Sequence, residues 1–306
     1  MKYIEIKQTD LKVSSVALGC MRIAGKSVEE VEQLIIKALD LGINFFDHAD
    51  IYGGGKSEQL FGEVLKRNPE LREKMIIQTK CSIIPGVAYD SSKEHILKSV
   101  NQSLENLQTD YIDVLLIHRP DALVDPKEVA DIFDELHITG KVKYFGVSNM
   151  NSMQIELLKK EVKQPLVFNQ LQFNVVNSTI IDAGINVNMD NLGAVDRDGS
   201  ILDYCRLNDI TIQPWSILQA SWELGGYLNH PNYQELNKVL DDLANKYKVE
   251  KSAIATAWIL RHPANMQPIA GTTSIEHLEE LVAACNIVLT REEWYRLYLS
   301  TGKTLP

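Results

Sequence analysis

Eight short apolar segments, each followed by a helical pattern, recur along this chain of 306 residues. The segments cover residues 16–18, 43–47, 75–80, 111–118, 143–148, 166–170, 210–215 and 266–271. Strands that alternate with helices pair in parallel, because each helix carries the chain back to the start of the next strand. Eight such units predict a (β/α)8 barrel. No Pro-, Gly- or Ser-rich linker interrupts the series, so we expect one domain over residues 1–306.

The segments between the strands carry helix boundary signals. Ser27 with Glu30 three residues later forms a capping-box pattern, and Gly42 closes the helix that follows. Gly140 is placed to end the helix predicted over residues 125–140. An alternating hairpin over residues 3–18 precedes the first strand, and an extra helix is expected at 291–299. Residues 175–200 break the rhythm and predict a long loop before a short helix, and residues 216–231 are also irregular.

The alternative fold is a doubly wound open sheet with an appended domain. Such a sheet binds dinucleotides through a GxGxxG turn after an early strand. The only early glycine run, Gly53-Gly54-Gly55, lacks this spacing. A nucleotide bound to this chain must therefore be held in another way, and the barrel is the favoured fold.

Charge and cysteine usage limit the partners. The net charge of -10 disfavours nucleic acid and anionic membranes, because an acidic surface repels phosphate. No apolar run approaches the roughly 18 residues of a membrane span, and residues 1–10 lack a secretory pattern. We therefore expect a cytoplasmic protein. The four cysteines, Cys20, Cys81, Cys205 and Cys285, form no CxxC pair, so reduced thiols and no metal site are expected.

Polar side chains gather at the predicted strand ends. In a barrel all eight carboxyl-terminal strand ends meet on one face, where functional residues collect. The residues at these ends are Asp47, Lys80, His118, Ser148, Asn149, Gln170, Trp215, Gly271 and Thr272. Strand ends with a purely structural role more often carry small or apolar residues, so this set indicates a site.

Three successive strands bring together the groups needed for proton transfer. Tyr52 lies five residues beyond Asp47, Lys80 ends the next strand and His118 the one after. A phenol has a pKa of about 10, and a neighbouring ammonium such as Lys80 is expected to lower it. Asp47 would pair with the buried ammonium, which is costly without a partner. Alone, each residue is more commonly a packing or solvated side chain, and only their joint order supports a site.

Several motifs are similar to those of the aldo-keto reductases. Residues 45–58 (FFDHADIYGGGKSE) resemble the D-x-A-x-x-Y signature, IIQTK the lysine strand and LLIHRP the histidine strand of that family. GVSNM, NQLQFN and QPWSIL resemble further family segments, so the likeness spans nearly the whole chain, and it is greatest to bacterial reductases of uncharacterised substrate. The resemblance implies a catalytic tetrad of Asp47, Tyr52, Lys80 and His118, with Tyr52 as general acid in carbonyl reduction.

The same resemblance implies how a nicotinamide cofactor is held. Ser148, Asn149 and Gln170 correspond to residues that hydrogen-bond the carboxamide, and Trp215 to an aromatic ring that stacks on the nicotinamide. The remaining residues implied in cofactor binding are Gly19, Met21, Arg22, Ser216, Leu218, Gly271, Thr272, His277 and Glu280.

The segment PIAGTTSIEHLEEL departs from the family pattern. Gly271 replaces a lysine, and His277 stands where an arginine often contacts the adenosine 2'-phosphate. Thr272 and its neighbours still offer hydroxyls and amides at a helix start, which suit an anion. NADPH is the expected cofactor, with NADH as the alternative.

Substrate and turnover are less constrained. The chain ends soon after the last helix, so loops at 82–92, 119–126, 175–200 and 217–231 are expected to select a small carbonyl substrate. Tyr89, Trp222 and Tyr227 are candidates to wall that pocket. Two other functions stay open: a nucleotide-bound sensor or accessory subunit with slow turnover, and a Schiff-base aldolase that uses Lys80. The oligomeric state is not indicated.

Overall fold

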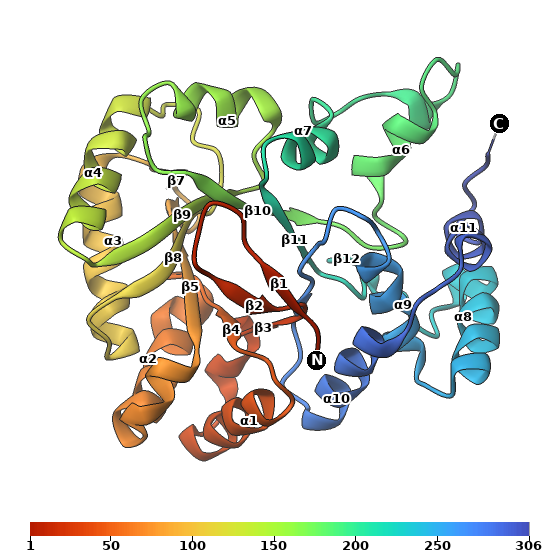
Figure 1. Ribbon diagram of the computed structural model, residues 1–306, viewed down its shortest axis with the longest axis horizontal. Coiled ribbons are helices and arrows are strands. Elements are labelled where there is room, and N and C mark those ends of the chain that lie inside the picture. Colours follow the sequence, from red (N-terminus) through yellow and green to blue (C-terminus); the bar gives the residue numbers. More distant parts are fainter. Residues whose placement is uncertain (306) are drawn as a thin grey trace.

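A parallel sheet of eight strands forms the centre of the computed structural model, which describes residues 1–305 (Figure 1). In chain order its strands are β3 (Ala17–Gly19), β4 (Phe45–Asp47), β5 (Ile76–Cys81), β8 (Ile112–Ile117), β9 (Val142–Ser148), β10 (Leu166–Gln172), β11 (Thr211–Trp215) and β14 (Ile269–Ala270). Neighbours in the sequence are neighbours in the sheet, and β14 returns to pair with β3. The predicted barrel fold is confirmed.

The barrel nearly closes between β11 and β14. These two strands are the ends of the sheet, but the backbone N–H of Gln267 donates to the carbonyl of Ile212 at 3.0 Å. Closure brings the carboxyl-terminal ends of the strands to one face, where the polar residues of the sequence prediction lie.

Helices surround the sheet (Figure 1). Those that connect successive barrel strands include α1 (Val28–Asp40), α2 (Lys56–Arg67), α3 (Lys93–Leu107), α4 (Pro126–Ile138), α5 (Ser152–Lys159), α7 (Ile201–Leu207), α8 (Gln234–Tyr247) and α9 (Lys251–Leu260). Two more follow the last strand: α10 (Ile275–Ala283) and the predicted extra helix α11 (Arg291–Leu299). The Ser27–Glu30 capping box is present at the start of α1, and Gly140 has a φ of +73° after α4.

The amino-terminal hairpin covers one end of the barrel (Figure 1). It consists of β1 (Tyr3–Glu5) and β2 (Lys12–Ser14), which pair antiparallel. Ile6, Leu11 and Val13 are buried among inward-facing strand residues such as Phe45 and Phe168. The hairpin therefore covers the end of the barrel opposite the strand-end face and packs against its inward-facing apolar residues.

Two irregular regions contain more structure than expected. Residues 175–200, expected as a loop, contain α6 (Thr179–Ile185) and a short 3-10 turn (Leu192–Ala194). Asp182 of α6 accepts hydrogen bonds from the hydroxyls of Ser178, in the preceding turn, and of Tyr298 on α11, so one distant contact helps to hold this helix. Small hairpins form within the other loops: β6 (Ile83–Ile84) with β7 (Ala88–Tyr89), and β12 (Gln219–Ser221) with β13 (Gly225–Gly226).

All four cysteines are buried and unpaired. Within residues 1–305, no helix combines the length and apolar character that crossing a bilayer requires.

Candidate active site

The four residues of the predicted tetrad meet at the strand-end face. Asp47 is the last residue of β4, Lys80 lies in β5, and His118 follows β8 directly. Tyr52 opens a 3-10 turn (Tyr52–Gly55) in which Gly53 and Gly54 have φ values of +60° and +65°. These left-handed conformations suit glycine, and they turn the chain sharply enough to leave the tyrosine over the strand ends.

Lys80 is the centre of this cluster and has no exposed surface. Its Nζ lies 2.8 and 2.9 Å from the two carboxylate oxygens of Asp47, 2.7 Å from the carbonyl oxygen of His48 and 3.1 Å from the hydroxyl of Tyr52. A buried ammonium needs this complement of acceptors, because desolvation without them is costly. The lysine therefore joins an acid on one side to a phenol on the other.

The charges around Lys80 determine its protonation. Burial lowers the pKa of Lys80. Attraction to Asp47 and Tyr52, together with the hydrogen bonds to both, raises the pKa by more than burial lowers it, so the net pKa lies above the ordinary value. The side chain is thus an ammonium at neutral pH.

The expected lowering of the Tyr52 pKa is wrong. Burial is the largest influence and raises the pKa of Tyr52; Lys80 lowers it as predicted, but by less. The ammonium is evident from the sequence, whereas the depth at which Tyr52 is buried depends on the folded structure. Tyr52 is therefore a phenol that keeps its proton at neutral pH, beside a cation able to stabilise the phenolate that forms when the proton leaves.

His118 faces Tyr52 as a neutral imidazole. The two ring centroids lie 6.1 Å apart in an edge-on arrangement. Burial, with repulsion from Lys80 and Arg119, lowers the pKa of His118 to about 2. Its Nδ1 is buried and has no hydrogen-bond partner within residues 1–305. A histidine that stays neutral can offer a hydrogen bond without bringing a second cation beside Lys80.

Asp47 is also held by glutamines, which the sequence prediction missed in this role. The Nε2 of Gln78 donates to its Oδ1 at 2.6 Å, and the Nε2 of Gln170 donates to the same oxygen at 3.0 Å. Gln78 also donates to Gln213 at 2.9 Å, and Gln213 to Gln267 at 2.9 Å. This series of hydrogen bonds ends at Gln267, whose amide donates to the backbone carbonyl of Ser14 at 2.7 Å.

This chain of amides crosses the barrel interior, and Gln78, Gln213 and Gln267 have no exposed surface. Hydrogen bonds to a buried carboxylate stabilise its charged form and fix its orientation. A signal was present in the sequence, because Gln78, Gln213 and Gln267 each follow an apolar residue of a predicted buried strand. Buried amides require partners, but the sequence does not say which.

The residues predicted to hold a nicotinamide carboxamide lie together. Ser148 donates to the carbonyl of Gln170 at 3.0 Å, and the amide of Asn149 donates to Ser148 at 2.7 Å. The indole N–H of Trp215 donates to Asn149 at 3.1 Å, which fixes the orientation of the ring. Asn149 has a φ of +56°, a conformation that asparagine tolerates better than most residues.

The predicted contacts on the first and last strands also converge. Gly19 ends β3, and a Cβ there would lie 2.8 Å from the side chain of Ile269, so any larger residue would force Ile269 to shift. Arg22 lies in the turn after β3. Its Nη1 donates to the carbonyl of Gly271, which directly follows the neighbouring strand β14, at 2.9 Å. Met21 beside it is exposed. A cation thus stands next to the segment that lacks the family's lysine and arginine.

The remaining predicted contacts lie around the ends of β11 and β14. Ser274 caps α10 by accepting from the N–H of His277 at 3.2 Å, and Thr272 accepts from the N–H of Ser274 at 3.1 Å. Glu280 is bound to α9 through the hydroxyl of Ser252 at 2.7 Å. Ser216 has a φ of +53°, and Leu218 packs partly buried against the core.

Of the three aromatic residues named as candidates to wall a substrate pocket, Tyr227 is instead a packing residue of the core. It has no exposed surface, and its hydroxyl donates to the carbonyl of Ile217 at 2.9 Å. The small hairpin of β12 and β13 turns this ring inward, which the loop sequence did not indicate. Trp222 and Tyr89 are exposed.

The residues present fit a nicotinamide nucleotide. The Trp215 ring is half-buried and oriented, as a stacking surface requires. The Asn149 amide has one strong hydrogen bond and one at 3.5 Å, to the carbonyl of His118, so its second N–H can exchange partners. Within residues 1–305, no group of three or more His, Cys, Asp or Glu is arranged to hold a metal ion.

A parallel α/β barrel with a polar cluster at its carboxyl-terminal strand ends is the architecture of a barrel enzyme. The particular family follows from comparison with known proteins: the sequence model of the aldo/keto reductase family matches residues 15–298, and the chain belongs to that family. Members are oxidoreductases that use nicotinamide cofactors and act on small-molecule carbonyl compounds.

Individual proteins with similar sequences or structures are also oxidoreductases or aldo-keto reductases. The chain is 38% identical over 280 residues to the oxidoreductase YdhF of Escherichia coli (strain K12), covering 89% of this chain and 87% of that protein. It is 36% identical to the uncharacterised oxidoreductase YcsN of Bacillus subtilis (strain 168), covering the whole of both chains. The crystal structure of a thermostable aldo-keto reductase, Tm1743, in complex with the inhibitor epalrestat has a TM-score of 0.77 and 26% identity, and covers 98% of this chain and 100% of that chain.

Proposed function

We propose that this protein reduces aldehydes or ketones to alcohols with a nicotinamide cofactor, preferring NADPH, and that Tyr52 is the general acid. The observation that carries the proposal is the position of Lys80, whose ammonium contacts both the Asp47 carboxylate and, at 3.1 Å, the Tyr52 hydroxyl. A reduced nicotinamide supplies the hydride when it is bound.

Proton transfer at the Tyr52 oxygen is the step that the protein's own residues perform. As negative charge develops on the substrate oxygen, Tyr52 gives it a proton and becomes a phenolate. An ammonium at 3.1 Å attracts that phenolate by about 5 kcal/mol at an effective dielectric constant of about 20. Because the ammonium is already in place, the site needs no rearrangement when the charge appears.

Asp47 and His118 have separate parts in this proposal. Asp47 keeps Lys80 charged and directed at Tyr52, and the Gln78 and Gln170 amides hold the carboxylate in turn. His118, as a neutral donor beside Tyr52, hydrogen-bonds the substrate carbonyl and orients it toward the phenol.

The residues that would hold the cofactor follow from the same geometry. Trp215 would stack on the nicotinamide ring, and Ser148, Asn149 and Gln170 would orient its carboxamide. Arg22 and the start of α10, with Thr272 and the backbone N–H groups beside it, would meet the phosphates. Support for NADPH comes from Arg22: its guanidinium hydrogen-bonds Gly271 through one nitrogen, and its other nitrogens have no hydrogen-bond partner within residues 1–305.

The test is NADPH oxidation with 4-nitrobenzaldehyde, comparing the wild type with Tyr52→Phe. The variant should lose about 10²–10⁴-fold in kcat, the range typical of a general acid, and should still quench tryptophan fluorescence on nucleotide binding. Tyr3→Phe, at the amino-terminal hairpin, is the matched control and should be unaffected. Equal turnover by the wild type and Tyr52→Phe would refute the role of Tyr52. Tight nucleotide binding with no steady-state reduction by the wild type would favour the sensor function instead.

A further inference from the structure

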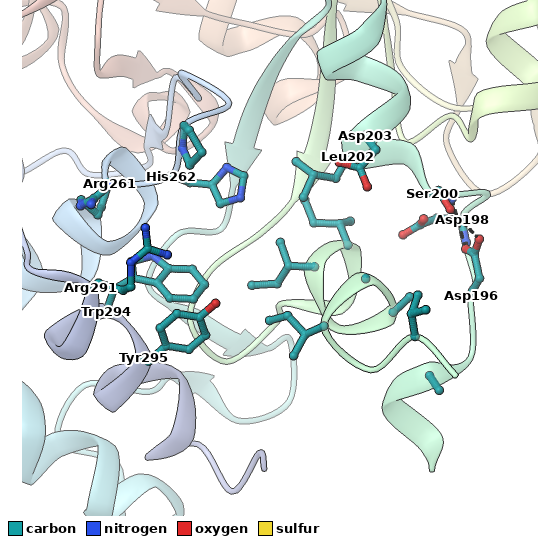
Figure 2. Close-up of a pocket in the computed structure, with 18 residues that line it drawn as sticks. Asp196, Asp198, Ser200, Leu202, Asp203, Arg261, His262, Arg291, Trp294 and Tyr295 are labelled. Atoms are coloured by element: carbon teal, nitrogen blue, oxygen red, sulfur yellow. Dashed lines mark hydrogen bonds between the residues drawn. The ribbon is translucent and has the colours of Figure 1, made fainter. Parts of the chain in front are cut away.

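A cavity of about 670 Å³ lies outside the barrel (Figure 2). It is bounded by the segment from α6 to α7, the end of α9 and the start of α11, and it shares no residue with the strand-end site. Small-molecule sites commonly have volumes of about 300–1,000 Å³. The cavity is therefore large enough for a ligand of roughly ten to twenty heavy atoms.

The α11 wall of this cavity is rigid. The ring of Trp294 stacks on Trp258 at 4.8 Å and on Tyr298 at 6.1 Å, with an interplanar angle of 8° in each case. Its indole N–H donates to the carbonyl of Trp258 at 3.0 Å, and the hydroxyl of Tyr298 donates to Asp182 of α6 at 2.9 Å. These contacts fix α6 relative to α11, so the two sides of the cavity are held in place before any ligand arrives.

Two arginines line the cavity near the start of α11. Arg291 is exposed at the first position of α11 and forms no ion pair within residues 1–305. Arg261 uses its Nε to bind the carbonyl of Leu289 at 2.8 Å and forms no ion pair in the same part of the chain. Figure 2 places His262 and the hydroxyl of Tyr295 beside them, facing the cavity.

Three aspartates, Asp196, Asp198 and Asp203, line the opposite side of the cavity (Figure 2). Asp196 accepts hydrogen bonds from the backbone N–H groups of residues 198, 199 and 200. Asp198 accepts from the N–H of Ile201 at 3.1 Å, and Asp203 lies 3.5 Å from Arg206. These carboxylates lie across the cavity from Arg291 and Tyr295, so the donors that an anionic group can reach without meeting a carboxylate are those on the α11 side.

We infer that this cavity binds an amphipathic carboxylate. Its anionic group meets the guanidinium of Arg291 and the hydroxyl of Tyr295, and its aryl or alkyl body lies against the apolar side chains of Ile181 and Leu202. Arginine and a phenol suit this head group, because the guanidinium can donate two parallel hydrogen bonds to one carboxylate. A cationic or neutral analogue would leave Arg291 without a partner.

The test is calorimetric titration of the full chain with 4-phenylbutyrate, without nucleotide. Arg291→Met should weaken binding at least tenfold, and Tyr295→Phe by a smaller factor. Arg296→Met is the matched control: this arginine lies on the same helix and pairs with Asp242, and its loss should change the affinity less than twofold. The uncharged analogue 4-phenylbutanol should bind at least tenfold more weakly than the carboxylate.

A third variant separates this cavity from the strand-end site, which could also accept an anion. His118→Ala should leave the affinity for 4-phenylbutyrate unchanged. No binding to the wild type, binding that is lost in His118→Ala but kept in Arg291→Met, or equal binding of 4-phenylbutylamine would each overturn the inference. None of these outcomes depends on whether the protein reduces carbonyls.

Discussion

Removal of the Asp47 charge should destabilise the protein far more than removal of an exposed carboxylate whose ion pair has the same N–O distance. Asp47→Asn deprives a fully buried ammonium of its one carboxylate partner within residues 1–305, at 2.8 Å. Two unit charges at that distance attract by about 6 kcal/mol at an effective dielectric constant of about 20. Lys80 keeps the His48 carbonyl and the Tyr52 hydroxyl as acceptors, which recover part of that energy.

Loss of the proton from Lys80 sets an upper limit on the destabilisation by Asp47→Asn. A lysine with an ordinary pKa of 10.5 can become neutral at pH 7 at a cost of about 5 kcal/mol, so the loss cannot exceed that value by much. We therefore expect Asp47→Asn to lower the free energy of unfolding by about 3–5 kcal/mol, the range found when one partner of a buried pair is removed.

Urea denaturation at pH 7, followed by circular dichroism, measures this loss. The control is Glu29→Gln, which breaks the pair with Arg67, also 2.8 Å long but with side chains 47% and 65% exposed. That change should cost about 0–1 kcal/mol. The double variant Asp47→Asn with Lys80→Met should recover about 2 kcal/mol or more relative to Asp47→Asn, because no buried charge is left unpaired. A loss in Asp47→Asn no greater than in Glu29→Gln would refute the reasoning.

Two further predictions concern Asp50 and Arg22. Burial raises the pKa of Asp50 to about 7 from 3.8. Between about pH 4 and 7 the folded state therefore keeps a proton on Asp50 that the unfolded state has lost. The free energy of unfolding falls as pH rises through that window. Asp50→Asn should therefore stabilise the protein by about 2–4 kcal/mol more at pH 8 than at pH 4, measured by urea unfolding; an equal effect at both pH values would contradict this. Arg22→Met should weaken NADPH binding about tenfold and NADH binding much less, as measured by fluorescence quenching, since a guanidinium pairs strongly with phosphate. Equal loss for both nucleotides would show that Arg22 does not contact the 2'-phosphate.

The sequence by itself determined the barrel and the order of its polar strand ends. Alternation of strand and helix is a local pattern, and parallel pairing follows from it without knowledge of distant contacts. The capping box at Ser27 and the left-handed Gly140 are likewise set by a few neighbouring residues. Once the strands were in order, Asp47, Lys80 and His118 had to meet, because the carboxyl-terminal ends of parallel strands share one face.

Only the tertiary structure decided the partners and energies of these groups. Gln78 and Gln213 are 135 residues apart in the chain and meet only because strand register and barrel closure direct both side chains into the interior. The sequence showed Lys80 beside Tyr52, but the depth of burial, which reverses the net shift of the Tyr52 pKa, depends on the whole surrounding fold. Helix α6 and the cavity beside Arg291 were hidden for the same reason: long-range contacts such as Tyr298 with Asp182 create them, and local periodicity carries no record of such contacts.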